Sequence, residues 1–267
     1  MTQPDDLARW VAAAATAPDG IRLILADIDG VLSGGEGSPF RPRLLEHMAA
    51  WNRSAARDLR RPAIALCSGR QAPYVELLAQ LSGCFLPCIF EHGAGILEPQ
   101  RFRFRFQPSL GAAPWREAAA VRQVIEAALG PDVAFVQPGK EVTLTLYPLG
   151  STSPAELGAA VTAALDRAGS GFVVTVNLRG VEVRPPGIDK GSGARWLSDQ
   201  LGVSLDRFAG VGDSEDDLTF LRLVGYPTAP ANARPAVRST ARYVARGAQD
   251  RGFLEILRHL SSLAGEA

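Results

Sequence analysis

The stretch LILADIDG, residues 23–30, decides the fold that we expect for this chain. Its apolar part predicts a short strand buried on both faces, as in a parallel sheet, and Gly30 ends that strand. Side chains at positions i and i+2 leave a strand on the same face, so Asp27 and Asp29 lie together. Two such carboxylates repel each other unless a cation or a proton lies between them. The pair predicts a metal site or a nucleophile beside an acid, although a plain Asp-Gly turn shows the same residues.

The alternation of helix and strand continues on both sides of this stretch. Further apolar strands are expected at residues 63–67, 88–91, 208–211, 227–231 and 243–244. Helices are expected at residues 4–17, 41–57, 71–81 and 189–201, after residue 217, from residue 234, and up to residue 263. This order predicts an α/β fold with a Rossmann-like, doubly wound parallel sheet and right-handed crossovers.

The middle of the chain has a different plan, in which a helix and two strands occur twice. Helices are expected at residues 115–129 and 154–168, and strands at 133–136, 142–147, 172–176 and 181–184. Each pair of strands reads as a hairpin, so this part predicts a small antiparallel sheet with both helices on one face. We therefore expect a core domain of residues 1–95 and 186–267 around an inserted α+β domain of residues 96–185.

The strands of the insert alternate between apolar and polar residues. The apolar side chains, expected to face the helices, are Val142, Leu144, Leu146, Val174, Val176, Val181 and Val183. The polar side chains, which share the other face, are Thr143, Thr145, Thr175, Asn177, Glu182 and Arg184. Such a polar face is usually solvated, but it could instead be a lid over a site.

Composition excludes several classes of protein. The 28 Lys and Arg residues balance 28 Asp and Glu residues, so no net charge favours nucleic acid or an anionic membrane. No stretch approaches the roughly 20 apolar residues of a membrane span, and the N-terminus lacks the features of a signal peptide. The three cysteines are odd in number and are expected to be reduced in the cytoplasm. Cys84 and Cys88 could be a redox pair or half a metal site, but buried structural cysteines are the favoured interpretation.

Arginines alternate with phenylalanines in RFRFRF, residues 101–106. The stripe could bind nucleic acid, but no wider basic patch supports that interpretation. An amphipathic edge strand is favoured, and the role of Arg101, Arg103 and Arg105 stays open.

Four short motifs follow one another in the order known from one enzyme family. They are Asp27-Ile28-Asp29-Gly30, Cys67-Ser68-Gly69-Arg70, Gly187-Ile188-Asp189-Lys190-Gly191 and Gly212-Asp213-Ser214-Glu215-Asp216-Asp217. The set resembles the phosphatase branch of the haloacid dehalogenase superfamily, and the insert is similar to the subclass IIB cap of its Cof-type members. The chain departs from these relatives at His92, where Asn is frequent, and in the glycine-rich loop of residues 33–39.

The resemblance implies a phosphatase that works through an aspartyl phosphate. A carboxylate can attack a phosphoryl group, and Asp27 is the expected nucleophile. Asp29 would protonate the leaving oxygen and then activate water. Lys190 would neutralise the nucleophile and the phosphoryl group, and Ser68 would bind the phosphate.

The charge that develops in phosphoryl transfer requires a cation, and the expected cofactor is Mg²⁺. The ligands would be Asp27 and Asp213, with Asp217 direct or through water and Asp29 through its main-chain carbonyl, as in the family. The residues expected to contact the substrate are Gly69, Arg70, Ser214 and Asn232 in the core and Thr145, Asn177, Glu182 and Arg184 in the insert.

We therefore expect a cytoplasmic phosphatase, monomeric or homodimeric, that acts on a small phosphorylated metabolite and binds neither nucleic acid nor membrane. A sugar phosphate, phosphoglycolate or a sugar-phosphoglycerate would suit the insert. Two alternatives stay open, namely a phosphomutase or other phosphotransferase, and a non-catalytic ligand-binding protein on this fold. A dehalogenase is less favoured, because it needs no metal.

Overall fold

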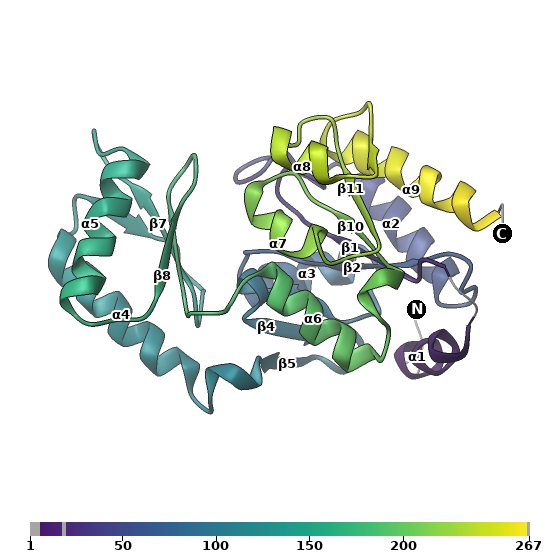
Figure 1. Ribbon diagram of the computed structural model, residues 1–267, viewed down its shortest axis with the longest axis horizontal. Helices are drawn as coiled ribbons and strands as arrows, with labels where there is room; N and C mark the ends of the chain where they lie inside the picture. Colours follow the sequence, from purple (N-terminus) through teal and green to yellow (C-terminus); the bar gives the residue numbers. More distant parts are fainter. Residues whose placement is uncertain (1–5, 18–19, 266–267) are drawn as a thin grey trace.

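The computed structural model describes residues 6–17 and 20–265, which form an α/β core and a smaller cap (Figure 1). The core holds a five-stranded parallel sheet in the order β12-β11-β10-β1-β2. Its strands are β1 (Leu23–Ala26), β2 (Ala63–Leu66), β10 (Phe208–Val211), β11 (Tyr226–Ala229) and β12 (Tyr243–Val244). The predicted Rossmann-like sheet is confirmed, with the stretch that carries Asp27 as the strand between β10 and β2.

Helices cover both faces of the core sheet because its strands are apolar on both sides. Leu23 and Leu25 of β1 pack toward α1 and α6, whereas Ile24 and Ala26 pack toward α2, α3 and α9. The core helices are α1 (Asp6–Thr16), α2 (Pro42–Ala55), α3 (Ala72–Leu81), α6 (Lys190–Leu201), α7 (Leu218–Leu221), α8 (Pro235–Thr240) and α9 (Gln249–Gly265). Residues 4–5 of the first expected helix lie outside the described residues. None of the helices within the described ranges is long and apolar enough to cross a membrane.

A second, three-stranded antiparallel sheet continues the core next to β2. It consists of β3 (Cys88–Phe90), β4 (Gly95–Glu98) and β5 (Arg103–Phe106). The expected strand at 88–91 thus meets β2 through a single parallel bridge, Cys67 to Ile89, and otherwise pairs with β4. The sequence pattern did not reveal this pairing, because the partner strand follows after a turn of only four residues, 91–94.

The arginine stripe lies on β5, at the edge of this small sheet. The expected edge strand is confirmed for residues 103–106, whereas residues 99–101 form a 3₁₀ turn. Arg101 and Arg105 pair with the buried Glu98 at 3.2 and 2.9 Å. The expected boundary between core and insert, at residues 95/96, stays a prediction. Because β4 and β5 pair with β3, we propose that the core extends to Gln107.

The cap has the predicted order, with each helix followed by a hairpin. Its elements are α4 (Pro114–Leu129), β6 (Ala134–Val136), β7 (Leu144–Pro148), α5 (Pro154–Arg167), β8 (Val173–Val176) and β9 (Val181–Arg184). The antiparallel sheet has the order β6-β7-β9-β8. Leu144, Leu146, Val181 and Val183 pack against both helices, as expected. Two expected residues differ. Val142 lies before β7 and packs on Ala94 and Ile188 of the core. Val176, on the edge strand β8, is 46 % exposed and is not part of the cap core.

The cap sheet lies between the cap helices and the core, so its polar face is turned to the core (Figure 1). Thr145, Glu182 and Arg184 are buried there. Glu182 lies 3.1 Å from His92 of the core, and Arg184 lies 3.6 Å from Asp216. These three side chains therefore do not form the solvated polar face that was considered from the sequence.

Truncation of the central strand tests this core. Leu25 has no exposed surface, so Leu25→Ala should lower the free energy of unfolding by about 2–5 kcal/mol, through lost burial and a residual cavity. Urea denaturation measures the change. The matched control is Leu77→Ala, at a 55 % exposed leucine of α3, which should cost less than about 0.5 kcal/mol. Equal losses in the two variants would contradict the described packing.

Candidate active site

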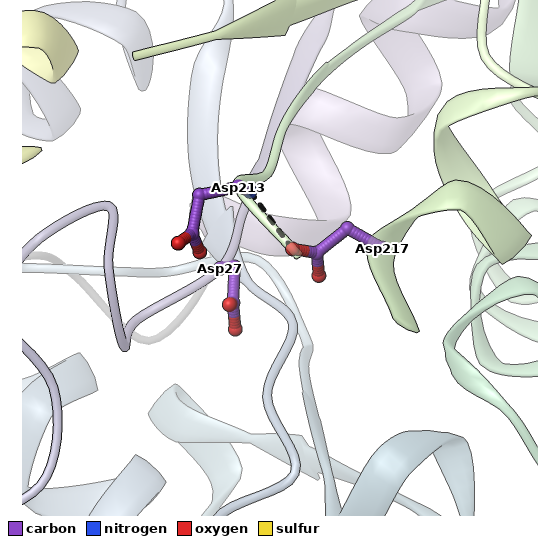
Figure 2. Close-up of side chains that lie close together, drawn as sticks. All are labelled: Asp27, Asp213 and Asp217. Carbon is purple, nitrogen blue, oxygen red and sulfur yellow. Dashed lines mark hydrogen bonds between the residues drawn. The ribbon is translucent and has the colours of Figure 1, made fainter. Parts of the chain in front are cut away.

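Three carboxylates meet at the carboxyl edge of the parallel sheet. Asp27 follows β1, Asp213 follows β10 after one residue, and Asp217 directly precedes α7. Figure 2 shows that the three side chains lie close together, and one oxygen of each lies within 4.8 Å of the others. Neighbouring parallel strands end at the same edge, so this gathering follows from the strand order.

Lys190 places a positive charge within this group. It is the first residue of α6, and the side chain of Asp189 caps that helix by accepting from Ser192 N. The Lys190 Nζ lies 2.8 Å from Asp27 Oδ1 and 2.6 Å from Asp217 Oδ1. Although burial opposes the charge, these two carboxylates hold the pKa of Lys190 well above its ordinary value. The ammonium group therefore stays charged beside the two buried carboxyl groups.

Asp217 is already saturated with hydrogen bonds. Its Oδ2 accepts from the main-chain N–H groups of Asp213 and Ser214, both at 2.9 Å, and from the Ser214 hydroxyl at 3.0 Å. Its Oδ1 accepts from Lys190. These contacts orient the loop that carries Asp213, so a contact of Asp217 with a metal through water suits the geometry better than a direct bond.

Asp27 and Asp213 provide oxygen donors of the kind that suits a divalent cation. Burial, and then the Asp217 charge, raise the pKa of Asp213 to about 7, and the same two causes raise the pKa of Asp27 well above its ordinary value. Asp213 Oδ1 is buried and has no hydrogen-bond partner within the described residues. Hard oxygen donors suit Mg²⁺. A cation would reduce the repulsion between the carboxylates and would give Asp213 Oδ1 a partner.

Gly30 leaves room for Asp213. Its φ is +86°, and a Cβ atom here would lie 2.2 Å from Asp213 Oδ2. Only glycine adopts this backbone shape without strain and also admits the carboxylate. Gly30 therefore both ends the strand and leaves space for the Asp213 carboxylate.

Asp29 does not belong to the three-carboxylate group within the described residues. Both of its oxygens accept from Arg70, at 2.7 Å each, in a bidentate ion pair. A protonated Asp29 would have to give up one of these bonds, so its roles as an acid and, through its carbonyl, as a metal ligand stay predictions. The pairing itself could not be foreseen, because the two residues are 41 positions apart.

The loop of residues 68–70 lies beside the nucleophile. Ser68 is buried and accepts from Arg70 N at 3.1 Å through its hydroxyl. The N-cap of α3 is Gln71, so Ser68 does not cap that helix. The imidazole of His92 covers Gly69 so closely that a Cβ atom there would lie 2.4 Å from the ring. A larger residue at position 69 would therefore collide with the His92 ring.

One cavity of about 620 Å³ joins these groups between core and cap. The predicted residues that line it are Asp27, Asp29, Ser68, Gly69, Arg70, Asn177, Glu182, Lys190, Asp213, Ser214 and Asn232. Asn232 donates to Gly30 O at 2.9 Å and accepts from Gln249 N at 2.8 Å. Thr145 and Arg184 are not among the described residues that line the cavity, but each forms a hydrogen bond with a residue that does. Thr145 donates to Glu182 at 2.9 Å, and Arg184 donates to Thr175 at 3.0 Å.

Several residues of the cavity were missed by the sequence patterns. The buried Lys140 contacts Thr145 and lies 3.1 Å from Glu182. Although burial opposes ionisation, Lys140 and His92 lower the pKa of Glu182 to about 2. Tyr147 donates to Glu36, which joins the cap to the glycine-rich loop. Lys140 could have been noticed as a basic residue in the Pro-Gly turn of the cap. No sequence pattern indicated that Glu36 and Tyr147 would line the cavity.

Comparisons with known proteins agree with this architecture. Residues 153–257 match the model of a family described as haloacid dehalogenase-like hydrolase. A phosphoglycolate phosphatase of Methanothrix thermoacetophila is 42 % identical over 80 residues, which are 30 % of this chain and 36 % of that protein. The chain thus spans about a third of the length of the first curated relatives that it matches.

Longer alignments exist at lower identity. A phosphoglycolate phosphatase of Natronomonas pharaonis is 26 % identical over 88 % of this chain and 95 % of its own length. A haloacid dehalogenase-like hydrolase from Bacteroides thetaiotaomicron superposes with a TM-score of 0.71 over 90 % of this chain and 99 % of its own, at 15 % identity. This structural similarity supports the fold.

Metal binding can be tested without any substrate. A ligand that binds only the folded protein stabilises it, by about 2.7 kcal/mol at 100 times its dissociation constant. Mg²⁺ should therefore raise the melting temperature, and Asp213→Asn should abolish that rise, because it removes a charged ligand. Asp132→Asn, at an exposed position of the cap, is the control and should respond like the unaltered protein. An unchanged Mg²⁺ response in Asp213→Asn would rule out this site.

Proposed function

We propose that this chain, which belongs to the haloacid dehalogenase-like hydrolases, is a Mg²⁺-dependent phosphatase that acts on a small phosphorylated metabolite. The observation that carries the proposal is the position of Asp27. It lies at the end of β1 beside Lys190 and Asp213 and borders the cavity between core and cap. The match of residues 153–257 to the family model includes the third and fourth motifs and supports the resemblance.

The proposed reaction begins with Asp27. Lys190 holds Oδ1 at 2.8 Å, and the second oxygen is proposed to attack phosphorus. The new bond between Asp27 and phosphorus forms as the bond from phosphorus to the leaving oxygen breaks, and Asp29 protonates that oxygen. Asp29 then takes a proton from water, which attacks phosphorus and releases Asp27 and phosphate. Mg²⁺, held by Asp27 and Asp213, would neutralise charge on the phosphoryl oxygens.

Arg70 connects substrate binding to the protonation of Asp29. In the structure its guanidinium group is engaged by Asp29, and Glu36 lies 4.0 Å away. A phosphoryl group accepts the same planar pair of N–H donors as a carboxylate does. We propose that Arg70 turns to the phosphoryl group when substrate binds, which frees Asp29 to carry the proton.

The substrate is proposed to extend from the phosphate toward the cap. A cavity of about 620 Å³ lies in the range of small-molecule sites and has room for more than a phosphoryl group. The curated relatives are phosphoglycolate phosphatases. We keep phosphoglycolate, a sugar phosphate and a sugar-phosphoglycerate as the candidate classes, and we propose that the enzyme works in the cytoplasm, where its three buried cysteines remain thiols.

A screen of phosphorylated metabolites with Mg²⁺ tests the proposal. Phosphate release from at least one member, lost with excess chelator and restored by Mg²⁺, is the expected result. Release from a sugar phosphate without a bisphosphate activator would argue against a phosphomutase. If no metabolite and no aryl phosphate is hydrolysed, the protein is not a phosphatase, and a ligand-binding role on the same fold becomes the better explanation.

The nucleophile is tested by Asp27→Asn. The substitution keeps the shape of the side chain but removes the attacking charge and one proposed metal ligand. Turnover should fall at least about a thousandfold, which corresponds to roughly 4 kcal/mol of transition-state stabilisation. Steady-state kinetics on folded protein measures the loss. A variant that retains a tenth of the original rate would disprove the role of Asp27.

The polar face of the cap is tested with Glu182→Gln and Arg184→Ala. Glu182 lines the cavity, and Arg184 holds Thr175, which also lines it. Both variants should lower kcat/KM strongly for the metabolite that the screen identifies, but hardly for a small aryl phosphate that does not reach the cap. Arg167→Ala, on the exposed side of α5, is the matched control. The polar face does not contribute to substrate recognition if neither variant changes the ratio of kcat/KM for the metabolite to kcat/KM for the aryl phosphate by more than about threefold, roughly 0.7 kcal/mol.

A further inference from the structure

Glu91 is a buried carboxylate that the proposed reaction does not use. It follows β3 of the core and has no exposed surface. Its oxygens accept from the main-chain N–H groups of Glu141, Val142 and Thr143, at 2.8, 2.9 and 2.9 Å, and from the Thr143 hydroxyl at 3.2 Å. All four donors are uncharged and belong to the segment that enters β7 of the cap. One core side chain thus binds three successive amides of the cap.

The turn that carries Glu91 has an unusual backbone. Glu91, His92 and Gly93 all have positive φ, at 47°, 56° and 103°. Residues other than glycine rarely adopt this conformation, and it persists only where surrounding contacts impose it. Gly93 also lies so close to the loop before α6 that a Cβ atom would be 2.1 Å from Asp189 O. The turn is therefore held in one shape from several sides.

The same turn is bonded to the phosphate loop. Glu91 N donates to Arg70 O at 2.9 Å, and His92 N donates to Ser68 O at 3.0 Å. The His92 ring covers Gly69, and its Nε2 lies 3.1 Å from Glu182 of the cap. Residues 91–92 thus contact the loop beside the nucleophile on one side and the cap sheet on the other, with no residue between them.

We propose that Glu91 is a positioning residue. It fixes the cap sheet over the loop of residues 68–70, at the distance from which cap side chains contact the substrate. The inference rests on the proposed function for its kinetic consequence only. A carboxylate is suited to this task because both of its oxygens accept. A glutamine side chain would turn an N–H₂ group toward one of the cap amides, so that two donors face each other.

The first arm of the test measures hydrogen exchange and needs no substrate. Glu91→Gln should make the amides of residues 141–143 exchange at least tenfold faster, while those of β10 stay unchanged. The matched control is Glu98→Gln, which alters another buried carboxylate at the end of β4. Glu98 pairs with Arg101 of the following 3₁₀ turn and with Arg105 of β5. That control should leave residues 141–143 unchanged. Equal exchange in Glu91→Gln and the unaltered protein would overturn the proposal.

The second arm compares two substrates. Glu91→Gln should lower kcat/KM at least tenfold for the metabolite found by the screen, but at most threefold for p-nitrophenyl phosphate, since the groups around Asp27 are untouched. An equal loss on both substrates would show a merely structural role and would overturn the proposal. If the unaltered protein hydrolyses neither compound, the proposed function fails, and the exchange arm still decides the role of Glu91.

A second variant covers the case in which Glu91→Gln does not fold. Thr143→Val removes only the hydroxyl contact with Glu91 and keeps the side-chain shape. It should accelerate exchange at residues 141–143 by about two- to fivefold and lower kcat/KM on the metabolite more than on p-nitrophenyl phosphate. No change in either measurement would count against the proposal.

Discussion

The buried ammonium group of Lys190 is the contact on which the site depends. It lies within 2.8 Å of Asp27 and 2.6 Å of Asp217, and all three side chains are buried. Burial and the charge of Asp217 raise the pKa of Asp27 well above its ordinary value, and the ammonium group of Lys190 opposes that rise. The helix cap at Asp189 aims Lys190 inward, so a local rule of helix formation sets the position of this charge.

A second level of organisation joins the core to the cap. The contacts across the cavity are polar and involve charged residues on both sides, with Glu182 near His92, Arg184 near Asp216 and Glu36 near Arg179. A polar substrate can replace such a contact only if it satisfies both of the groups that are released, because a buried charge without a partner is costly. Glu91 differs from them, because it binds main-chain amides that a substrate does not replace.

Much of the fold was predictable because it depends on local rules. The apolar strands expected at residues 23–26, 63–67 and 208–211 each precede a polar residue or glycine. In the cap strands, the alternation of apolar and polar residues indicated which face packs on the helices. The exceptions have physical causes. Val142 follows the alternation but precedes the strand, so it packs on the core instead. The pairing of β4 and β5 with β3 was missed, because short strands after a tight turn carry little periodic signal.

The sequence by itself identified most of the residues that the structure gathers at one edge of the sheet. Asp27, Ser68, Lys190 and Asp213 stand at strand ends or helix starts, and parallel strands bring such positions to one edge. Only the tertiary structure decided the pairings among residues far apart in the chain. Arg70 engages Asp29, Lys140 holds Glu182, and Glu91 binds the cap. No local pattern encodes these contacts, because they depend on how the two halves of the core and the cap pack in three dimensions.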